Sequence, residues 1–406
     1  MTRRHPAVLV LVVALAAAGC GKGQSSDAGS PTGDTLKIGA ALSLTGSLAK
    51  EGQLTKQGYQ LCEEIVNSKG GVSAGGKSYK LAIAYRDDTS EPDTAAQLVD
   101  RFNDQAIKLV LGPYGSPSTE AAAAVVEKNG QVMVDSSGAD NNIFTKGYRQ
   151  TFAVLSPATS YAKVMIQALA SQAKPKPRTV VFLSADDGFS KTVAKGGAEE
   201  AHKQGIKVLA TETFPEKSTD VSAAVNKAKS LNPDLVVGAV HLVEGIAIIK
   251  QSKELGLKPA GGFLETVAPP TPDFVRTLGA SAEGVVGSTQ WVPQVTGEDK
   301  FFGTAQEYAS SFKKRFGSDA EYHSAEAAAA CLALVLGTEN AGSTEPAKVR
   351  DAIARLDSPS FFGPIKFDST GKNVTKQMSV IQIQDGKPVT VFPTDQQQSA
   401  LKWPAQ

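Results

Sequence analysis

Residues 58–85 read GYQLCEEIVNSKGGVSAGGKSYKLAIAY, and within this stretch the spacing of apolar side chains changes from helical to strand-like. The apolar residues before the glycines recur at helical spacing, and those after them alternate with small or polar residues. The glycines between positions 70 and 76 therefore end a helix and lead into a strand, a place where positive φ angles favour glycine. A helix followed by a strand is one step of an α/β fold.

Two catalytic patterns overlap this turn, and the context rejects both. Residues 71–78, GVSAGGKS, match the phosphate-binding pattern G-x-x-x-x-G-K-[ST], and residues 71–75 match the nucleophile elbow G-x-S-x-G. Both sites require a strand before the loop and a helix after it. The sequence predicts the reverse order, so we expect neither a nucleotide site nor a nucleophilic serine here.

Helical and strand patterns alternate on both sides of this turn, in one series before residue 137 and a second after residue 157. Short apolar strands separated by helices predict an α/β fold with two doubly wound, mainly parallel-sheet lobes. The length of 406 residues and the hydrophobic content of 41% suit two cores rather than one. The elements after Phe301 are too few for a third domain, and we expect them to complete the two lobes.

The N-terminus has the layout of an export signal. Residues 1–19 contain two arginines, then an uncharged apolar run and small residues. Cys20 follows where a bacterial lipobox carries its lipid-modified cysteine, although Ala17 stands where leucine is commonest. Residues 20–34, rich in Gly, Ser and Asp, predict a flexible tether. We expect a protein that is lipid-anchored on the outer face of the cell membrane; plain secretion with an incidental cysteine is the alternative.

Charge and residue content argue against several classes of protein. The 42 basic and 41 acidic residues nearly balance and no basic run is visible, which disfavours a nucleic-acid partner. The histidines show no metal-ligand spacing, and the cysteines form no CxxC pair. We predict no metal site, no cofactor and no enzymatic activity.

A set of motifs, taken in their order along the chain, resembles the leucine/isoleucine/valine-binding family of bacterial solute receptors. The resemblance extends from about residue 35 to the terminal strands. Its motifs include IGAALSLTGSLAKEG at 38–52, YRDDTSEPDTA at 85–95, GPYGSPSTEAA at 112–122, SSGADNNIFTKGY at 136–148, DDGFSK at 186–191 and GGFLET at 261–266. Members of that family are periplasmic binding proteins of the type I fold, and they deliver ligands to ABC importers.

The resemblance implies two lobes joined by a three-segment hinge, with a ligand in the cleft between them. The first lobe would comprise residues 35–155 and 291–376, and the second lobe residues 156–290 and 377–406. The resemblance also implies a monomer that binds a small molecule, most often an amino acid, closes by a hinge motion and works with a membrane permease. Two alternatives stay open: a ligand sensor of the same fold, and a receptor for another solute such as an amide or an aromatic acid.

One end of the expected site lies on the first lobe. The loop GPYGSPST follows an apolar strand and precedes a helix, so its backbone N–H groups and the positive helix end favour an anion. Ser116 resembles the family's carboxylate-binding serine, and Tyr114 belongs to the same loop; an N-cap serine without a ligand is the alternative. Ser137 and Ala139 stand where the family uses a backbone carbonyl and a threonine hydroxyl, and Ala139 cannot supply a hydroxyl.

The resemblance implies that the second lobe binds the ligand's amine. Glu265 stands at the family's ammonium-binding acid, and Phe189 at a position that is commonly aromatic. Leu242, or its neighbour His241, stands where the family often has tyrosine. Glu51, on the first lobe, stands where the family commonly has an aromatic ring. If Glu51 faces the cleft, the pocket for the ligand side chain is acidic; the alternative is a solvated glutamate.

Two cysteines remain besides Cys20. By the resemblance, the late helix with Cys331 returns to the lobe that contains Cys62, so the two side chains can meet there. A disulfide and a pair of buried thiols both fit the sequence.

Overall fold

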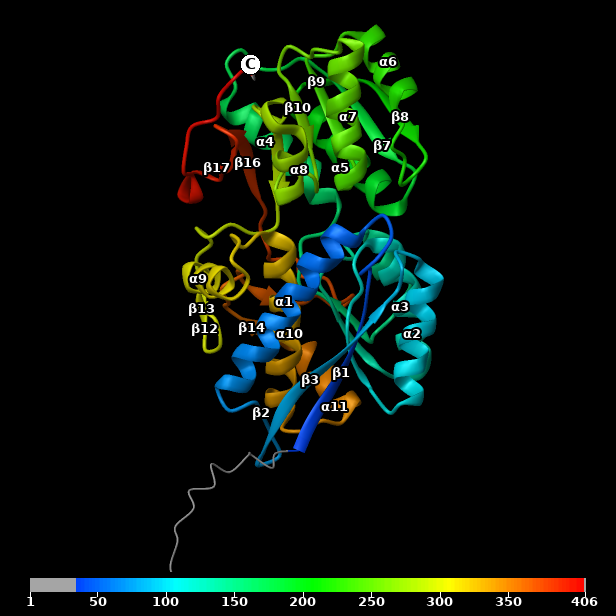
Figure 1. Cartoon of the computed structure of the whole chain (residues 1–406), viewed down its shortest axis with the longest axis vertical. Helices are drawn as coiled ribbons and strands as arrows, with labels where there is room; N and C mark the ends of the chain where they lie inside the picture. Colours follow the sequence, from blue (N-terminus) through cyan, green and yellow to red (C-terminus); the bar gives the residue numbers. More distant parts are fainter. Residues whose placement is uncertain (1–33, 405–406) are drawn as a thin grey trace, which may run out of the picture. The chain divides into compact units, whose positions relative to one another are not determined.

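The computed structural model describes residues 34–404, which form two lobes, each built on its own sheet (Figure 1). The expected α/β fold with two doubly wound, mainly parallel sheets is confirmed. The predicted signal peptide, Cys20 and all but the last residue of the predicted tether lie outside the described residues. Within residues 34–404, no helix has the length and apolar character that a membrane span requires.

The first lobe contains a six-stranded sheet in the order β2-β3-β1-β4-β5-β6, parallel except for the antiparallel pair of β2 with β3. Its strands are β1 (Asp34–Leu42), β2 (Val72–Ala74), β3 (Lys77–Asp87), β4 (Leu109–Leu111), β5 (Val132–Asp135) and β6 (Thr151–Ala153). The helices that follow them are α1 (Ala49–Ser68), α2 (Pro92–Asp104), α3 (Ser116–Asn129) and the 3-10 helix η1 (Asn141–Thr145).

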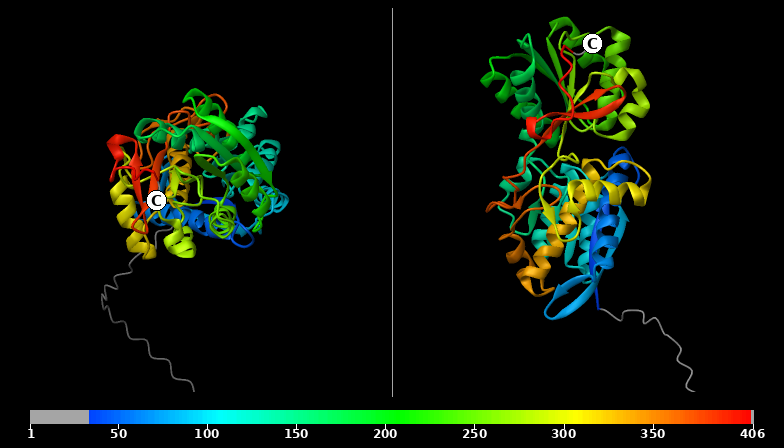
Figure 2. Two further views of the ribbon diagram at one scale, coloured as in Figure 1. Left: turned by 90° about the horizontal axis from the view of Figure 1, so that it is seen from above. Right: turned by 90° about the vertical axis from the view of Figure 1, so that its left-hand side faces the viewer.

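The second lobe contains a seven-stranded sheet in the order β17-β16-β11-β10-β9-β7-β8, in which β16 is antiparallel to both of its neighbours, β11 and β17. Its strands are β7 (Thr179–Ala185), β8 (Lys207–Phe214), β9 (Leu235–Ala239), β10 (Phe263–Glu265), β11 (Val286–Thr289), β16 (Ser379–Gln384) and β17 (Lys387–Phe392). Its helices are α4 (Thr159–Gln172), α5 (Gly188–Lys203), α6 (Ser222–Leu231), α7 (Leu242–Leu255), α8 (Pro272–Leu278), η2 (Gly279–Ala282) and η3 (Thr394–Gln396). Figure 2 shows the two sheets from two further directions.

After β11 the chain returns to the first lobe and packs a long helix against α1 (Figure 1). The returning elements are β12 (Glu298–Asp299), β13 (Gly303–Thr304), α9 (Ala305–Phe316), α10 (Tyr322–Ala341), α11 (Pro346–Ile353), β14 (Asp357–Ser358) and β15 (Ile365–Lys366). Helices α1 and α10 approach closely at Gly58, where a Cβ would lie 2.1 Å from the carbonyl oxygen of Ser324. A disulfide joins Cys62 of α1 to Cys331 of α10.

The turn at residues 71–78 has the predicted context, with helix α1 before it and strand β3 after it. The prediction missed one element, because the glycines also enclose the three-residue strand β2. Gly75 and Gly76 form the tip of the hairpin between β2 and β3, with φ angles of 58° and 76°. Two successive positive φ angles are typical of a tight hairpin turn, and they explain the glycine pair without a phosphate ligand.

The strand order opens a crevice at one edge of each sheet. In the first sheet β1 lies between β3 and β4, and in the second sheet β7 lies between β8 and β9. The chain runs from the central strand to its neighbour on one side, β3 or β8, and then crosses to the neighbour on the other side, β4 or β9. The loops at the carboxyl ends of the strands diverge at such a reversal, and ligands of open α/β sheets bind there. The first crevice is bordered by the loops after β1 and β4, and the second by the loops after β7 and β9.

Three segments cross between the lobes, and hydrogen bonds join them to one another. The side chain of Gln290 accepts from the backbone N–H of Ser156 at 3.0 Å and donates to its carbonyl at 3.1 Å. The hydroxyl of Ser156 donates to the carbonyl of Lys376 at 2.8 Å. The ammonium of Lys376 donates to the carbonyl of Gln290 at 2.6 Å, so each crossing segment is bonded to both others.

Candidate functional site

The candidate site lies where the two crevices meet. Tyr114, in the loop after β4, places its hydroxyl oxygen 3.4 Å from Nδ1 of His241, in the loop after β9 of the other lobe. The same hydroxyl lies 3.3 Å from Nε2 of His323, in the first turn of α10. Tyr114 and His323 are buried. One phenol therefore connects an imidazole from each lobe.

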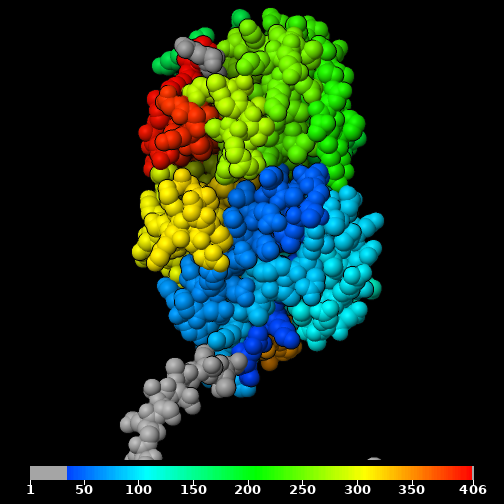
Figure 3. Space-filling model, in the orientation of Figure 1, coloured from blue at the N-terminus to red at the C-terminus, as the bar shows by residue number. Residues whose placement is uncertain are grey.

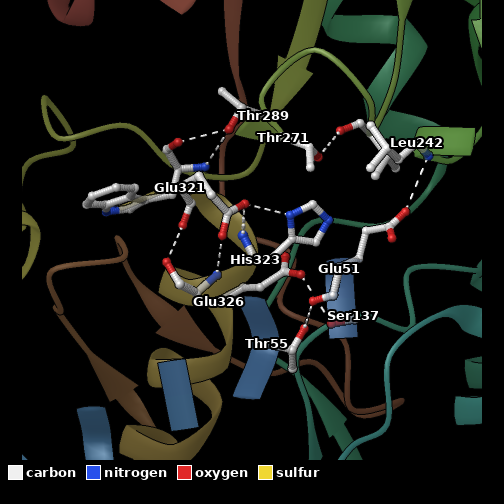
Figure 4. A network of polar contacts seen from close by, with 12 residues as sticks. Glu51, Thr55, Ser137, Leu242, Thr271, Thr289, Glu321, His323 and Glu326 are labelled. Carbon is white, nitrogen blue, oxygen red and sulfur yellow. Dashed lines mark hydrogen bonds and ion pairs between the residues drawn. The ribbon is translucent and has the colours of Figure 1, made fainter. Parts of the chain in front are cut away.

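Glu51 faces the second lobe rather than solvent. Its side chain is fully buried, and its Oε1 accepts a hydrogen bond from the backbone N–H of Leu242, the first residue of α7, at 3.3 Å (Figure 4). A carboxylate at a helix N-terminus is favoured by the unpaired N–H groups there. Burial raises the pKa of Glu51, and the imidazoles of His241 and His323 and two backbone hydrogen bonds offset part of the rise.

His323 is held by the residue that begins its helix. Glu321 is the N-cap of α10, and its carboxylate accepts from the backbone N–H groups of His323 and Ser324, both at 2.8 Å. It also lies 2.6 Å from Nδ1 of His323, so this nitrogen carries a proton (Figure 4). With Nδ1 fixed as a donor, Nε2 is the nitrogen that faces Tyr114.

Ser137 and Ala139 lie in the loop after β5, at the carboxyl edge of the first sheet. The hydroxyl of Ser137 donates to Oε1 of Glu326, a buried residue of α10, at 3.2 Å. Burial raises the pKa of Glu326 well above its usual range, and the negative charges of Glu321 and Asp135 add to this rise. The Ser137 carbonyl accepts from the N–H of Ala139, so the backbone at these two positions is already paired.

Ser116 is the first residue of α3, and the N-cap position belongs to Gly115, so the interpretation of Ser116 as an N-cap serine is wrong. The Ser116 hydroxyl accepts from the backbone N–H of Asp140 at 3.0 Å, which leaves its own hydrogen available for donation. A cavity of about 40 Å³ lies beside this helix end; its lining includes Gly115, Pro117 and Ser118 of the first lobe and Asp187, Lys217, His241 and Glu244 of the second.

Phe189 places an aromatic ring of the second lobe at this junction. Its ring centroid lies 5.1 Å from that of Tyr161 and 5.1 Å from that of His241, and its side chain is buried. His241 also meets the ring of Tyr114, so Phe189 and Tyr114 both pack against the same imidazole. The structure thus brings Glu51, Tyr114, Phe189 and Leu242 together at one junction.

Glu265 ends strand β10 and is fully buried. Both of its carboxylate oxygens lack a hydrogen-bond partner among residues 34–404, and burial raises its pKa well above the usual range. The carboxylate lies beside Gly245 in the first turn of α7, where a Cβ would lie 2.6 Å from Oε2. This carboxylate can therefore gain a partner only from a bound molecule or by moving.

Sequence reasoning missed the part of the site that α10 supplies, namely Glu321, His323 and Glu326. Metal-ligand spacing is the one histidine pattern that the sequence analysis tests, and His323 does not fit it. The local signal was an acid and a histidine just before the alanine-rich run of α10. These side chains reach the cleft because the chain returns to the first lobe after β11. The local spacing of residues in the sequence does not predict such a long-range contact.

Further contacts between the lobes lie around the junction. The ammonium of Lys217 donates to the carbonyl of Ser90 at 3.1 Å and lies 3.3 Å from Glu91. Lys50 of α1 pairs with Asp273 of α8 at 3.6 Å. The space-filling view shows blue atoms, where β1 ends and α1 begins, in contact with the green second lobe on the visible face (Figure 3). The two lobes are therefore in direct contact around the junction.

Comparison with known proteins finds one matching family and several related binding proteins. A family described as periplasmic binding protein matches residues 35–388. The chain is 22% identical over 391 residues to a Leu/Ile/Val-binding protein homolog of Brucella suis, covering 92% of this chain and 95% of that protein. It is 24% identical to a leucine-, isoleucine-, valine-, threonine- and alanine-binding protein of Pseudomonas aeruginosa, covering 83% and 87% of the two chains.

Solved structures share the fold. The branched-chain amino acid transporter substrate binding protein LivJ of Streptococcus pneumoniae, in complex with isoleucine, gives a TM-score of 0.76 at 22% identity, covering 87% of this chain and 98% of that one. A solute binding protein of R. palustris in complex with benzoate gives 0.74 at 18% identity, covering 88% and 95%. From the match over residues 35–388 and the two-lobed fold, the chain belongs to the periplasmic binding protein family.

Proposed function

We propose that this protein captures a small solute, most favourably an amino acid, between its two lobes and delivers it to an ABC importer. The observation that carries the proposal is the junction of Glu51 with Leu242 and of Tyr114 with His241, where polar groups from both lobes meet in a buried place. A solute that contacts both lobes shifts an open-closed equilibrium toward the closed form. The names of the relatives support an amino acid as the solute.

The polarity of the site supports a molecule with a carboxylate and an amine. The α3 end with the free hydrogen of Ser116 suits the carboxylate, and the unpartnered Glu265 suits the ammonium. The cavity of about 40 Å³ beside α3 is smaller than ligand pockets of roughly 300–1,000 Å³. Uptake of an amino acid therefore requires the lobes to part, and closure follows binding.

Membership of the family supports an extracytoplasmic location. We further propose that Cys20 carries a lipid, that the protein is anchored to the outer face of the cell membrane, and that it acts as a monomer beside a permease. A ligand sensor of the same fold would use the same cleft. Permease genes next to this gene would support import, and a neighbouring sensor kinase would support sensing.

The experiment that tests the proposal is a thermal-shift screen of free amino acids, small amides and aromatic acids. A ligand at a hundred times its Kd stabilises the folded protein by about 2.7 kcal/mol, which gives a clear shift. We expect an amino acid to give the largest shift, and Glu265→Gln to reduce its affinity. If benzoate or another acid without an amine wins and Glu265→Gln leaves its affinity unchanged, the solute is an aromatic acid, for which the ring of Phe189 offers a wall.

A further inference from the structure

Two buried carboxylates on helices α1 and α10 of the first lobe each keep one oxygen without a partner within residues 34–404. Oε1 of Glu51 accepts from Leu242, and Oε1 of Glu326 accepts from Ser137. Oε2 of each residue is buried and has no hydrogen bond within residues 34–404. An unpartnered buried polar atom costs free energy, and an unpartnered buried charge costs more. Each Oε2 is therefore a place where a bound molecule can supply a hydrogen.

The side chains around Glu51 do not supply a permanent cation. The charged groups that act on it are the imidazoles of His241, from the loop before α7, and His323, from α10. Tyr114 lies between these imidazoles, and Glu321 holds His323 from the other side. The neighbours of Glu51 are thus imidazoles, a phenol and the backbone N–H groups of Glu51 itself and of Leu242, and the N–H of Leu242 already bonds Oε1.

Lys376, the lysine whose charge acts on Glu326, forms its hydrogen bonds with other groups. Lys376 acts on Glu326 through its charge, but its ammonium donates to the carbonyls of Gln290 and Gln377, both at 2.6 Å. Those two bonds belong to the crossings between the lobes. Lys376 therefore acts on Glu326 through its charge and gives it no hydrogen bond, so Oε2 of Glu326 stays without a partner within residues 34–404.

We propose that Glu51 determines specificity for a ligand whose far end carries a cationic nitrogen group, so that the solute is a basic amino acid rather than an aliphatic one. This inference rests on the proposed function, with the α-carboxylate and α-amine bound as described there. An ammonium or guanidinium group would donate to the free Oε2 of Glu51. The aromatic rings of Tyr114 and Phe189, which both pack against His241, can attract a cation.

An aliphatic side chain would have the opposite effect. A methyl or methylene group against Oε2 would exclude water and leave the oxygen unpartnered, so binding would lose free energy at this end. The position of Glu51 argues for the same conclusion, because α7 fixes Oε1 at Leu242 and a cation at Oε2 completes the set of partners.

The test compares lysine with norleucine, which has the same straight chain without the terminal ammonium. In isothermal titration we expect the wild-type protein to bind lysine, ornithine or arginine at least tenfold more tightly than norleucine, leucine or glutamine. Glu51→Gln should reduce the affinity for the basic ligand at least tenfold and leave norleucine unchanged or improved. Glu64→Gln, an exposed glutamate on the same helix, is the matched control and should keep the wild-type preference.

The outcomes separate this inference from the proposed function. If norleucine or leucine binds better than lysine, or if Glu51→Gln keeps the wild-type ratio, Glu51 does not select a cation, while the amino-acid receptor stands. Tight binding of glutamine equal to that of lysine also overturns the inference, because a neutral amide would then suffice. If no amino acid binds, the proposed function fails, and this inference fails with it.

A measurement on the wild-type protein covers the case in which Glu51→Gln does not fold. A cation at Oε2 favours the ionised form of Glu51, so binding of lysine should release more protons than binding of norleucine. Titration in two buffers with different enthalpies of ionisation reports this difference. Protons that Glu265 releases to the buffer when it pairs with the α-ammonium are common to both ligands and cancel. Equal proton release for lysine and norleucine would contradict the role of Glu51.

Discussion

Gly188 of the second lobe approaches Asp140 of the first lobe so closely that a Cβ at Gly188 would lie 2.3 Å from Oδ2 of Asp140. Asp140 cannot easily turn away, because its Oδ1 accepts from the hydroxyl of Thr192, again across the junction, at 2.8 Å. Closure therefore brings a backbone position without a side chain against a fixed carboxylate.

Gly188→Ala should oppose closure and leave each lobe folded. We expect ligand affinity to fall about tenfold, which corresponds to ~1.4 kcal/mol, with little change in the unfolding temperature without ligand. Titration calorimetry measures the affinity, and X-ray scattering should show a smaller decrease of the radius of gyration on ligand addition than in the wild type. Lys195→Ala, an exposed change on the same helix, is the control. An affinity equal to that of the wild type would mean that the junction tolerates the methyl group.

Lipid attachment can be checked in the native host. Labelled fatty acid should be incorporated into the wild-type protein and not into Cys20→Ala, because the thiol of Cys20 is the proposed attachment point. Cys62→Ala is the control and should keep the label. Incorporation that persists in Cys20→Ala would contradict the lipobox interpretation.

The disulfide between Cys62 and Cys331 should stabilise the first lobe. These residues are 269 positions apart, and a crosslink over a long loop typically contributes about 2–5 kcal/mol by restricting the unfolded chain. Denaturing, non-reducing thiol counts should find neither cysteine free, and the double change Cys62→Ala, Cys331→Ala should lower the unfolding temperature. Two free thiols in the native protein would show that the cysteines remain reduced.

Lys376 should make stability depend on pH. Burial lowers its pKa to about 7 in the folded protein, against an ordinary value of 10.5. Between these values the unfolded chain binds more protons, so the free energy of unfolding rises as pH increases from about 7 toward 10.5, and the penalty is complete below that window. In Lys376→Met this contribution to the pH slope should disappear.

Urea unfolding at several pH values from 6 to 10 would measure the slope. Lys387→Met, which removes an exposed lysine of β17, is the control and should keep the wild-type slope. Equal slopes for wild type and Lys376→Met would mean that Lys376 keeps its proton throughout the range.

The burial of Glu51 could be predicted from the sequence, but its hydrogen-bond partner could not. Glu51 lies four residues before Thr55, and the same spacing continues to Tyr59, so helical periodicity puts Glu51 on the buried face of α1. That its carboxylate meets the start of α7 depends on how the lobes close. Hydrophobic periodicity reports which face of a helix is buried and carries no information on what lies against it.

The same distinction explains the other outcomes. The α/β alternation and the loops at the strand ends follow from local spacing, and they place Ser116, Ser137 and Glu265 near the carboxyl edges of their sheets. The packing of Glu265 beside Gly245 and the contact of His323 with Tyr114 join segments that are distant along the chain. Such contacts are fixed by tertiary packing.

The bonds among Ser156, Gln290 and Lys376 have a mechanical consequence. Three independent connections would let the lobes twist, shear and tilt separately, whereas hydrogen bonds that join all three crossings couple their movements. A solute at the junction then acts on these coupled crossings, and the outer surfaces of both lobes change their spacing together. A permease that contacts both lobes can in this way read occupancy as a distance, without touching the solute.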